Sequence, residues 1–332
     1  MYYIKKVKEF ILLELNIWKN YGFKAAWYDF LKNFIFRKNE GIGKRIYKKK
    51  YDYIKTLLND RYVKKFFVDE NIKYTNIKQD CTIWMFWWQG INEDTPKTVI
   101  NCLKTIEKNK GEHKVVVITK DNITEYLKLP KYYYEKLEKG CFTLTHFSDI
   151  IRIELLAKYG GIWMDATIML TEQLPMEMYD LPFYTIKHNL FADWHVCQGK
   201  WTGFFIATGE NNPFLKYLRE MFRMYWKEND FLICYLLIDC FIALGYENNQ
   251  LFEKFIEDIE ISNEKIFFID EQGNEKYDKT TYENIMNTTN IFKIHYKKHF
   301  KEYNEKQELT YYGYIMRNVC LGEEKWQQME MF

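Results

Sequence analysis

The chain has 332 residues, of which 47% are hydrophobic and 28% are charged, and its formal net charge is +2. This composition excludes a disordered chain and suffices for one large α/β domain with an accessory region. Aromatic residues make up 19% of the chain; their faces suit sugar rings and bases, although most are expected in the core.

The first part of the chain is basic and helical in pattern. Residues 1–65 carry 17 Lys and Arg against 6 Asp and Glu, a balance of +11. Apolar residues recur there at steps of three and four, which predicts a helical region over residues 1–75. Trp18, Trp27 and Phe30 lie among the basic residues, a mixture typical of a surface that binds anionic membranes. A helical layer packed on the main domain is the alternative.

Several features bear on the compartment and on other partners. No apolar run is long enough to span a bilayer, and the charged start of the chain makes a poor signal peptide. Seven scattered cysteines without a CxxC pair fit reduced thiols. We expect a cytoplasmic protein, peripheral at the inner face of the plasma membrane. The basic region contains no nucleic-acid-binding motif, so no nucleic acid is expected as a partner.

From residue 76 to residue 332 the pattern becomes that of an α/β domain. Residues 82–88 form an apolar run typical of a strand buried on both faces. A helix over 96–108 and a second buried strand over 114–119 follow, and this alternation predicts a mostly parallel sheet. Further strands are predicted at 162–164, 183–186, 203–207, 265–269 and 291–296, and further helices at 145–158, 213–226, 232–244 and 311–319.

One segment joins several polar residues to this framework. Asp149 and Arg152 lie three residues apart on a predicted helix that is otherwise mainly apolar, where charged groups need partners. Gly160 and Gly161 permit a tight turn into the next strand. Asp165 follows that strand, and ligands of open α/β sheets bind at the carboxyl ends of strands. A carboxylate there can bind ribose hydroxyls or a divalent cation on a pyrophosphate.

The string Ser148-Asp149-x-x-Arg152, Gly160-Gly161-x-x-x-Asp165-x-Thr167 resembles the core of glycosyltransferase family 32 and its bacterial capsular polysaccharide synthesis relatives. Softer similarities extend the resemblance over about residues 80–315. It implies a GT-A fold and an α-linked, retaining transfer from a UDP-sugar. Thr167 departs from the related Asp-x-Asp motif, and a hydroxyl is a weaker cation ligand than a carboxylate.

The resemblance also implies roles for individual residues. Asp149 and Arg152 would hold donor hydroxyls and phosphate, and Asp165 would contact ribose or a metal. Asp239 is the one candidate nucleophile. The implied sites are Asp149, Arg152, Asp165 and Asp239 for catalysis, Trp87, Trp88, Lys293, His295 and Lys297 for the donor, and Asp165, Thr167 and His295 for a divalent cation, Mn²⁺ or Mg²⁺.

Two classes of function follow. The first is an enzyme that transfers a hexose, galactose or glucose, to a polyprenyl-diphosphate-linked capsular or exopolysaccharide repeat unit. The alternative is a catalytically degenerate protein that binds a nucleotide sugar or acts as a scaffold in capsule assembly. Thr167 keeps the alternative open, whereas the intact Asp149, Arg152 and Asp165 favour the enzyme.

Overall fold

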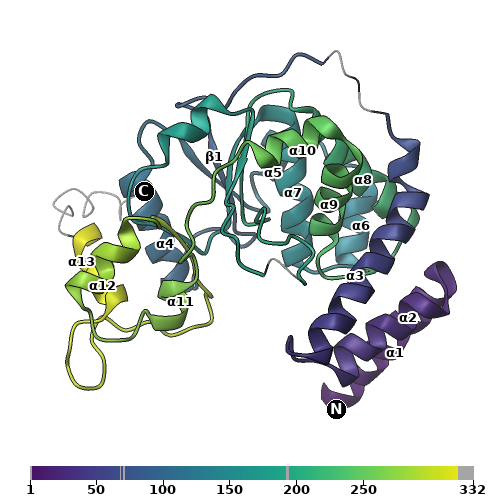
Figure 1. Ribbon diagram of the computed structural model, residues 1–332, viewed down its shortest axis with the longest axis horizontal. Helices are drawn as coiled ribbons and strands as arrows, with labels where there is room; N and C mark the ends of the chain where they lie inside the picture. Colours follow the sequence, from purple (N-terminus) through teal and green to yellow (C-terminus); the bar gives the residue numbers. More distant parts are fainter. Residues whose placement is uncertain (1, 68, 70–71, 192–193, 321–332) are drawn as a thin grey trace.

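The computed structural model describes residues 2–67, 69, 72–191 and 194–320. A central sheet divides the molecule (Figure 1). Helix α4 and the C-terminal helices lie on one side of it, and the helices α5 to α10 lie on the other. The N-terminal helices α1 to α3 are added at the far end of that second side. The predicted α/β class with an N-terminal helical region is confirmed.

The central sheet has five strands in the order β2-β1-β3-β6-β5. Its strands are β1 (Ile83–Phe86), β2 (Val115–Ile118), β3 (Gly161–Met164), β5 (Phe183–Thr185) and β6 (Phe205–Thr208). The pairs β1–β2 and β1–β3 are parallel, while β3–β6 and β5–β6 are antiparallel. The sheet is therefore mixed rather than mostly parallel in its pairing, because β5 returns into β6 through a loop and antiparallel neighbours need no crossover helix.

Helix α7 packs between the sheet and α8, and most of its residues are buried. The helices around the sheet are α4 (Lys97–Asn109), α5 (Ile123–Tyr126), α6 (Lys131–Glu138), α7 (Leu144–Tyr159), α8 (Pro213–Glu228), α9 (Leu237–Asn248) and α10 (Gln250–Glu257). An ion pair with two hydrogen bonds of 2.7 Å, from Arg223 to Glu154, joins α8 to α7. Such a paired arrangement fixes orientation as well as distance, so α7 is held firmly against its neighbour.

The turn between α7 and β3 requires glycine. Gly160 and Gly161 have φ values of 65° and 99°. A Cβ atom on Gly161 would lie 2.5 Å from the carbonyl oxygen of Thr82. Trp84 Nε1 donates to the carbonyl of Gly160 at 3.0 Å. The two glycines therefore allow the backbone to pass close to β1 and to direct β3 toward the site, as their pattern predicted.

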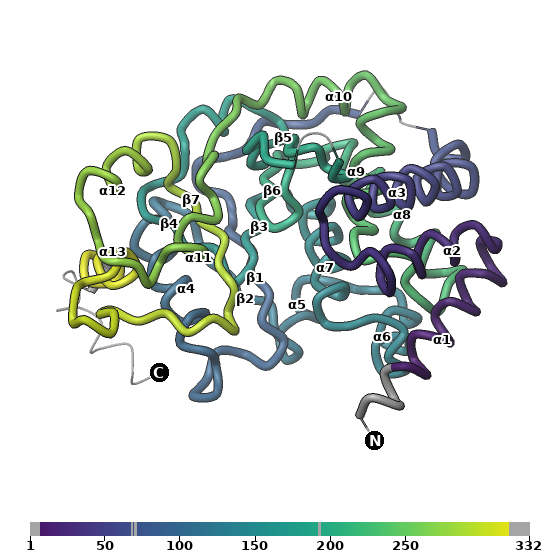
Figure 2. Tube along the Cα trace, turned by 60° about the horizontal axis from the view of Figure 1, so that its bottom comes forward, coloured from purple at the N-terminus to yellow at the C-terminus, as the bar shows by residue number. Residues whose placement is uncertain are grey.

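A smaller lobe completes the fold. Its strands β4 (Ile168–Leu170) and β7 (Ile291–Lys293) pair antiparallel, and its helices are α11 (Phe268–Gln272), α12 (Lys279–Met286) and α13 (Tyr311–Cys320). Figure 2 shows these elements gathered beside α4. The strand predicted at 265–269 is wrong, since a turn there leads into α11. Short apolar runs do not distinguish a strand from a buried helical turn.

Of the three N-terminal helices, the third docks on the main domain and the first two expose apolar side chains. They are α1 (Tyr2–Tyr21), α2 (Phe23–Phe30) and α3 (Ile42–Arg61). Arg61 pairs with Glu228 at 3.0 Å, and Tyr21 donates to Asn229 at 2.9 Å, so the region is fastened to the end of α8. Within the described residues, no helix combines the length and the apolar character that crossing a bilayer requires.

A buried ion pair joins α2 to α3. Lys50 Nζ lies 2.5 Å from Asp29 Oδ1, and only about one-twentieth of either side chain is exposed. Asn33 donates to the other oxygen of Asp29 at 2.7 Å. Burial and the neighbouring Asp29 raise the pKa of Glu14 on α1 to about 8, so Glu14 is mostly protonated at neutral pH. Lys50 is thus the cation that compensates the charge of Asp29.

Replacing Lys50 by Met should lower the free energy of unfolding by about 3–5 kcal/mol, because it leaves a buried carboxylate without its cation. Lys48→Met is the matched control on the same helix, since Lys48 pairs with Asp52 in a half-exposed position and should cost less than about 1 kcal/mol. Urea unfolding followed by circular dichroism measures both. Equal losses in the two variants would contradict a stabilising buried pair.

Candidate active site

Asp165 lies at the centre of the candidate site, and three other side chains donate hydrogen bonds to it. It follows β3 directly, and its Oδ1 accepts hydrogen bonds from Arg152 Nη2 at 3.0 Å and from Trp163 Nε1 at 2.9 Å. Its Oδ2 accepts from Lys293 Nζ at 2.7 Å. Burial opposes ionisation of this carboxyl, but the two cations outweigh it and hold its pKa below the usual value. Asp165 is therefore a carboxylate whose two oxygens both face cations of the chain.

Arg152 connects α7 to the end of β3. Its side chain is only 4% exposed, and its Nη1 lies 2.9 Å from Asp149 Oδ1. The guanidinium also lies 4.9 Å from the ring centroid of Trp163. The Asp149–Arg152 pair follows from the spacing of the two residues, whereas the contact with Asp165 depends on the turn after α7. The sequence placed these residues on the right elements, and the fold brings them together.

Lys293 lies on β7, and Thr167 directly precedes β4, the other strand of the smaller lobe. Lys293 lies opposite Ile168 in the β4–β7 pair, one residue beyond Thr167. Its Nζ donates to Thr167 Oγ1 at 2.7 Å as well as to Asp165. The ammonium therefore bridges the two residues that correspond to the acidic positions of an Asp-x-Asp motif. The resemblance implied Lys293 at the donor site but did not predict this bridge.

Two further carboxyl groups lie deeper. Burial raises the pKa of Asp149 to about 7, with a contribution from nearby Asp165 and Asp239, while Arg152 opposes the shift. Burial also raises the pKa of Asp239 to about 6, although Trp201 Nε1 donates to its Oδ1 at 3.0 Å. Asp239 interacts electrostatically with Asp149 and Arg152, so the fold brings it into the same charged cluster. Both groups exchange protons near neutral pH, as acid–base groups must.

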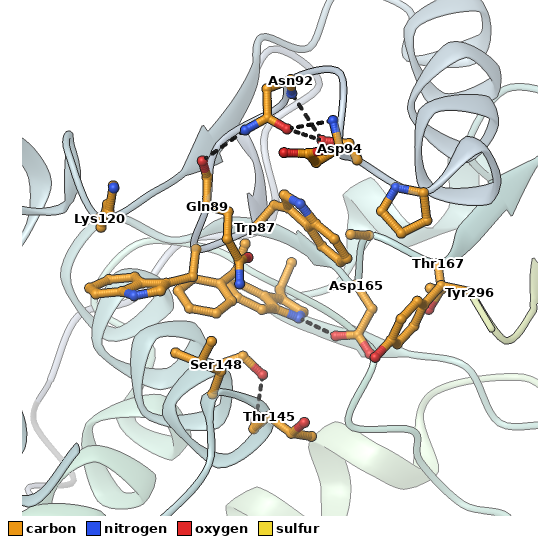
Figure 3. A pocket seen from close by; sticks show the side chains of 17 residues that line it. Trp87, Gln89, Asn92, Asp94, Lys120, Thr145, Ser148, Asp165, Thr167 and Tyr296 are labelled. Carbon is orange, nitrogen blue, oxygen red and sulfur yellow. Dashed lines mark hydrogen bonds between the residues drawn. The ribbon is translucent and has the colours of Figure 1, made fainter. Parts of the chain in front are cut away.

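A cavity of about 670 Å³ opens in front of Asp165 (Figure 3). This volume is within the range of small-molecule sites. The predicted residues Trp87, Trp88, Asp165 and Thr167 line it. The sequence analysis did not identify the other lining residues, which come mainly from the loop after β1, the start of α7 and the segment after β7: Phe86, Gln89, Asn92, Asp94, Thr95, Pro96, Lys120, Leu144, Thr145, Ser148, Trp163, Ala166 and Tyr296. Two of them had a sequence signal: Ser148 belongs to the quoted motif, and Trp163 lies two residues before Asp165, where strand residues face the same side.

Two predicted residues lie apart from Asp165. His295 is 72% exposed, and its Nδ1 lies 3.0 Å from Asp270 Oδ2. Lys297 lies with its ammonium 5.7 Å from the centroid of the Tyr296 ring. Neither side chain lines the cavity. The chain reverses after β7 and directs Tyr296, rather than its neighbours, into the cavity.

The residues at Asp165 do not fit a divalent cation. Both of its oxygens face nitrogen donors, and the hydroxyl of Thr167 accepts from Lys293. Among the described residues, no three His, Cys, Asp or Glu side chains are placed to hold a metal ion. His295, the third residue predicted for the cation, is paired with Asp270. A hard cation such as Mg²⁺ or Mn²⁺ needs oxygen ligands free of bound ammonium.

Comparisons with known proteins found a matching family and similar proteins. The profile of the family described as "Capsular polysaccharide synthesis protein" matches residues 34–315. The chain is 24% identical over 168 residues to the O-glycosyltransferase braB of Annulohypoxylon truncatum, covering 45% of this chain and 38% of that protein. It is 24% identical over 156 residues to the glycosyltransferase afumC of Aspergillus fumigatus, covering 43% and 40%.

The matched part thus spans about two fifths of the length of these curated relatives. Among solved structures, the PaToxG glycosyltransferase aligns with a TM-score of 0.35 and 17% identity, over 66% of this chain and 84% of that chain.

The raised pKa of Asp239 predicts a pH-dependent stability. A folded-state value of about 6 exceeds the unfolded value near 4, so wild-type stability is lost as pH rises through this window. Asp239→Asn removes the titration. The free energy of unfolding of the variant relative to wild type should therefore increase by about 2 kcal/mol from pH 4 to pH 7. Urea unfolding at four pH values measures it; a difference that is constant or falls with pH would contradict the assignment.

Proposed function

The chain belongs to the capsular polysaccharide synthesis protein family, and from this membership we propose that it is a glycosyltransferase. It transfers a hexose, galactose or glucose, from a UDP-sugar to a lipid-linked acceptor of a capsular polysaccharide or exopolysaccharide. The observation that carries the proposal is the charged cluster around Asp165, a residue that lines a cavity large enough for a nucleotide sugar. The two named relatives, both glycosyltransferases, support the same class of reaction.

The cluster suits the chemistry of sugar transfer. The bond between the anomeric carbon and the phosphate oxygen breaks, and its electron pair leaves with the nucleoside diphosphate. A bond from an acceptor hydroxyl to the anomeric carbon forms, and the hydroxyl proton passes to the departing phosphate or to water. Arg152 and Lys293 offset the charge that develops on the diphosphate. Asp149 and Asp239 favour the positive charge that develops on the sugar ring.

The tryptophan side chains of the cavity wall suit a nucleobase. Trp87 and Trp88 both line the cavity. Trp87 packs edge-on against Tyr296 with a centroid distance of 6.0 Å, and Trp88 packs against Phe147 at 5.5 Å. These contacts hold the indole rings at the cavity wall, where a flat base can stack on them. This arrangement supports uridine as the base of the donor.

The N-terminal helices supply a surface for the lipid that carries the acceptor. The rings of Phe23, Trp27, Phe30 and Phe34 stack in succession, with centroids 5.2 to 6.1 Å apart. Phe23, Trp27 and Phe34 are about half or more exposed. We call Trp18 and these four residues the aromatic face. An apolar face of this kind beside many basic residues suits an anionic bilayer, so the protein is proposed to act at the inner face of the plasma membrane.

The degenerate or scaffold function remains the alternative, and turnover separates it from the enzyme. A pure binding protein would hold a UDP-sugar without releasing UDP. The bridged, ionised Asp165 and the two carboxyl groups that titrate near neutral pH support the enzyme, because a passive binding site needs no such groups.

Wild-type protein should release UDP from UDP-galactose, UDP-glucose or UDP-N-acetylglucosamine faster than it releases GDP from a GDP-sugar. Asp165→Asn should lower turnover about a hundredfold or more, since it removes the charge that positions Arg152 and Lys293. Thr167→Ala should cost about tenfold, because water can replace the hydroxyl. Coupled release assays, after each variant is shown to melt like the parent, measure both effects. Near-normal activity of Asp165→Asn would contradict the proposed site.

The triple variant Trp18→Ser/Phe23→Ser/Trp27→Ser should weaken binding to vesicles containing phosphatidylserine at least about tenfold, because it removes much of the apolar area that enters the bilayer. Vesicle co-sedimentation measures binding, and added salt should weaken it further. Phe67→Ser is the control, since Phe67 is exposed but lies outside the aromatic face. Equal vesicle binding by the triple variant and wild type would rule out this surface.

A further inference from the structure

We infer that the Lys293 ammonium takes the place of the divalent cation at this site, so that donor binding and sugar transfer need no metal. The inference rests on the proposed function and deepens it. Its starting point is the bridge from Lys293 Nζ to Asp165 Oδ2 and Thr167 Oγ1, each 2.7 Å long. Asp165 and Thr167 both line the cavity, and Figure 3 shows them beside Tyr296 at one end of it.

The backbone fixes Lys293 at this place. The amide of Lys293 donates to the carbonyl of Ile266 at 2.9 Å, and the amide of Ile294 donates to the carbonyl of Thr167 at 3.1 Å. The ammonium also lies 5.1 Å from the centroid of the Phe204 ring. Strand pairing on one side and an aromatic ring near the charge therefore restrict where the side chain can go. The ammonium of Lys293 is therefore held in a defined position, unlike that of a flexible lysine on the surface.

The arrangement disfavours a metal at the same position. A divalent cation bound to Asp165 and Thr167 would lie close to the ammonium that already binds both. Two unit charges of like sign 4 Å apart repel by roughly 4 kcal/mol near a protein surface, and a divalent ion doubles this. Thr167 offers only a neutral hydroxyl in return. The hydroxyl at position 167 and the ammonium of Lys293 thus both favour a lysine over a metal ion at this position.

Lys293 retains a donor for the substrate. An ammonium has three N–H groups, and Asp165 and Thr167 accept two of them. The third is available to an oxygen of the donor diphosphate. When the bond from the anomeric carbon to phosphate breaks, the electron pair moves onto that diphosphate, and Lys293 stabilises the added charge while keeping its own protons. Arg152 supplies the second positive charge.

The test compares metal-free and metal-loaded protein by two independent measurements. Isothermal titration calorimetry with UDP, in chelator and in millimolar Mn²⁺, should give dissociation constants for wild type that agree within about twofold. Turnover of the UDP-sugar should be equally insensitive to the chelator. Lys293→Ala should weaken UDP binding at least about tenfold in chelator and lower turnover about a hundredfold, whereas Lys293→Arg should keep metal-free binding because it keeps the charge.

A gain of metal dependence completes the design. Lys293→Ala/Thr167→Asp restores two carboxylates and removes the competing cation, so Mn²⁺ should tighten its UDP binding at least about tenfold. Lys279→Ala, at an exposed lysine of the same lobe, is the control and should match wild type. Wild-type binding or turnover that is lost in chelator and restored by Mn²⁺ would overturn the inference, as would an unaffected Lys293→Ala. UDP binding without turnover would instead overturn only the proposed transfer, and no UDP binding in either buffer would overturn both.

Discussion

A partly buried carboxylate at the end of a strand must be compensated, and the cations around Asp165 determine how the parts of this molecule meet. Arg152 reaches it from α7, Trp163 from β3 and Lys293 from β7. These contacts connect the large α/β domain to the smaller lobe, because β7 and β4 carry Lys293 and Thr167 to the same point. Asp165 and Trp163 themselves line the cavity. Stability and function therefore depend on the same electrostatic arrangement.

The arrangement of charge explains how one site can both hold an anion and assist a developing cation. Arg152 and Lys293 remain positive, while Asp149 and Asp239 lie in surroundings that raise their pKa values toward neutrality. When these two groups are protonated, the cluster is net positive and suits a diphosphate. When they ionise, they favour a positive sugar ring. The lysine between Asp165 and Thr167 supplies within the chain the positive charge that a metal would otherwise bring.

The N-terminal helices have two roles, since one helix docks on the main domain and the others expose an apolar surface. Helix α3 is fastened to the main domain, and the buried Lys50–Asp29 pair joins it to α2. Helices α1 and α2 then present the aromatic face outward. The two interpretations of the sequence, a membrane-binding region and a packed helical layer, are compatible, because different faces of the same helices carry them. A docked layer gives an apolar surface a fixed position relative to the cavity.

The sequence by itself determined the local features: the buried strands around residues 83–86 and 115–118, the Asp149–Arg152 spacing, the glycine turn and the place of Asp165 after β3. Each depends on residues close in the chain, where periodicity and backbone sterics act directly. Tertiary structure decided that β6 runs antiparallel to β3. It also decided that His295 pairs with Asp270 and that Lys293 lies between Asp165 and Thr167. Lys293 and Asp165 are 128 residues apart, and only strand pairing between β4 and β7 brings an ammonium to that carboxylate.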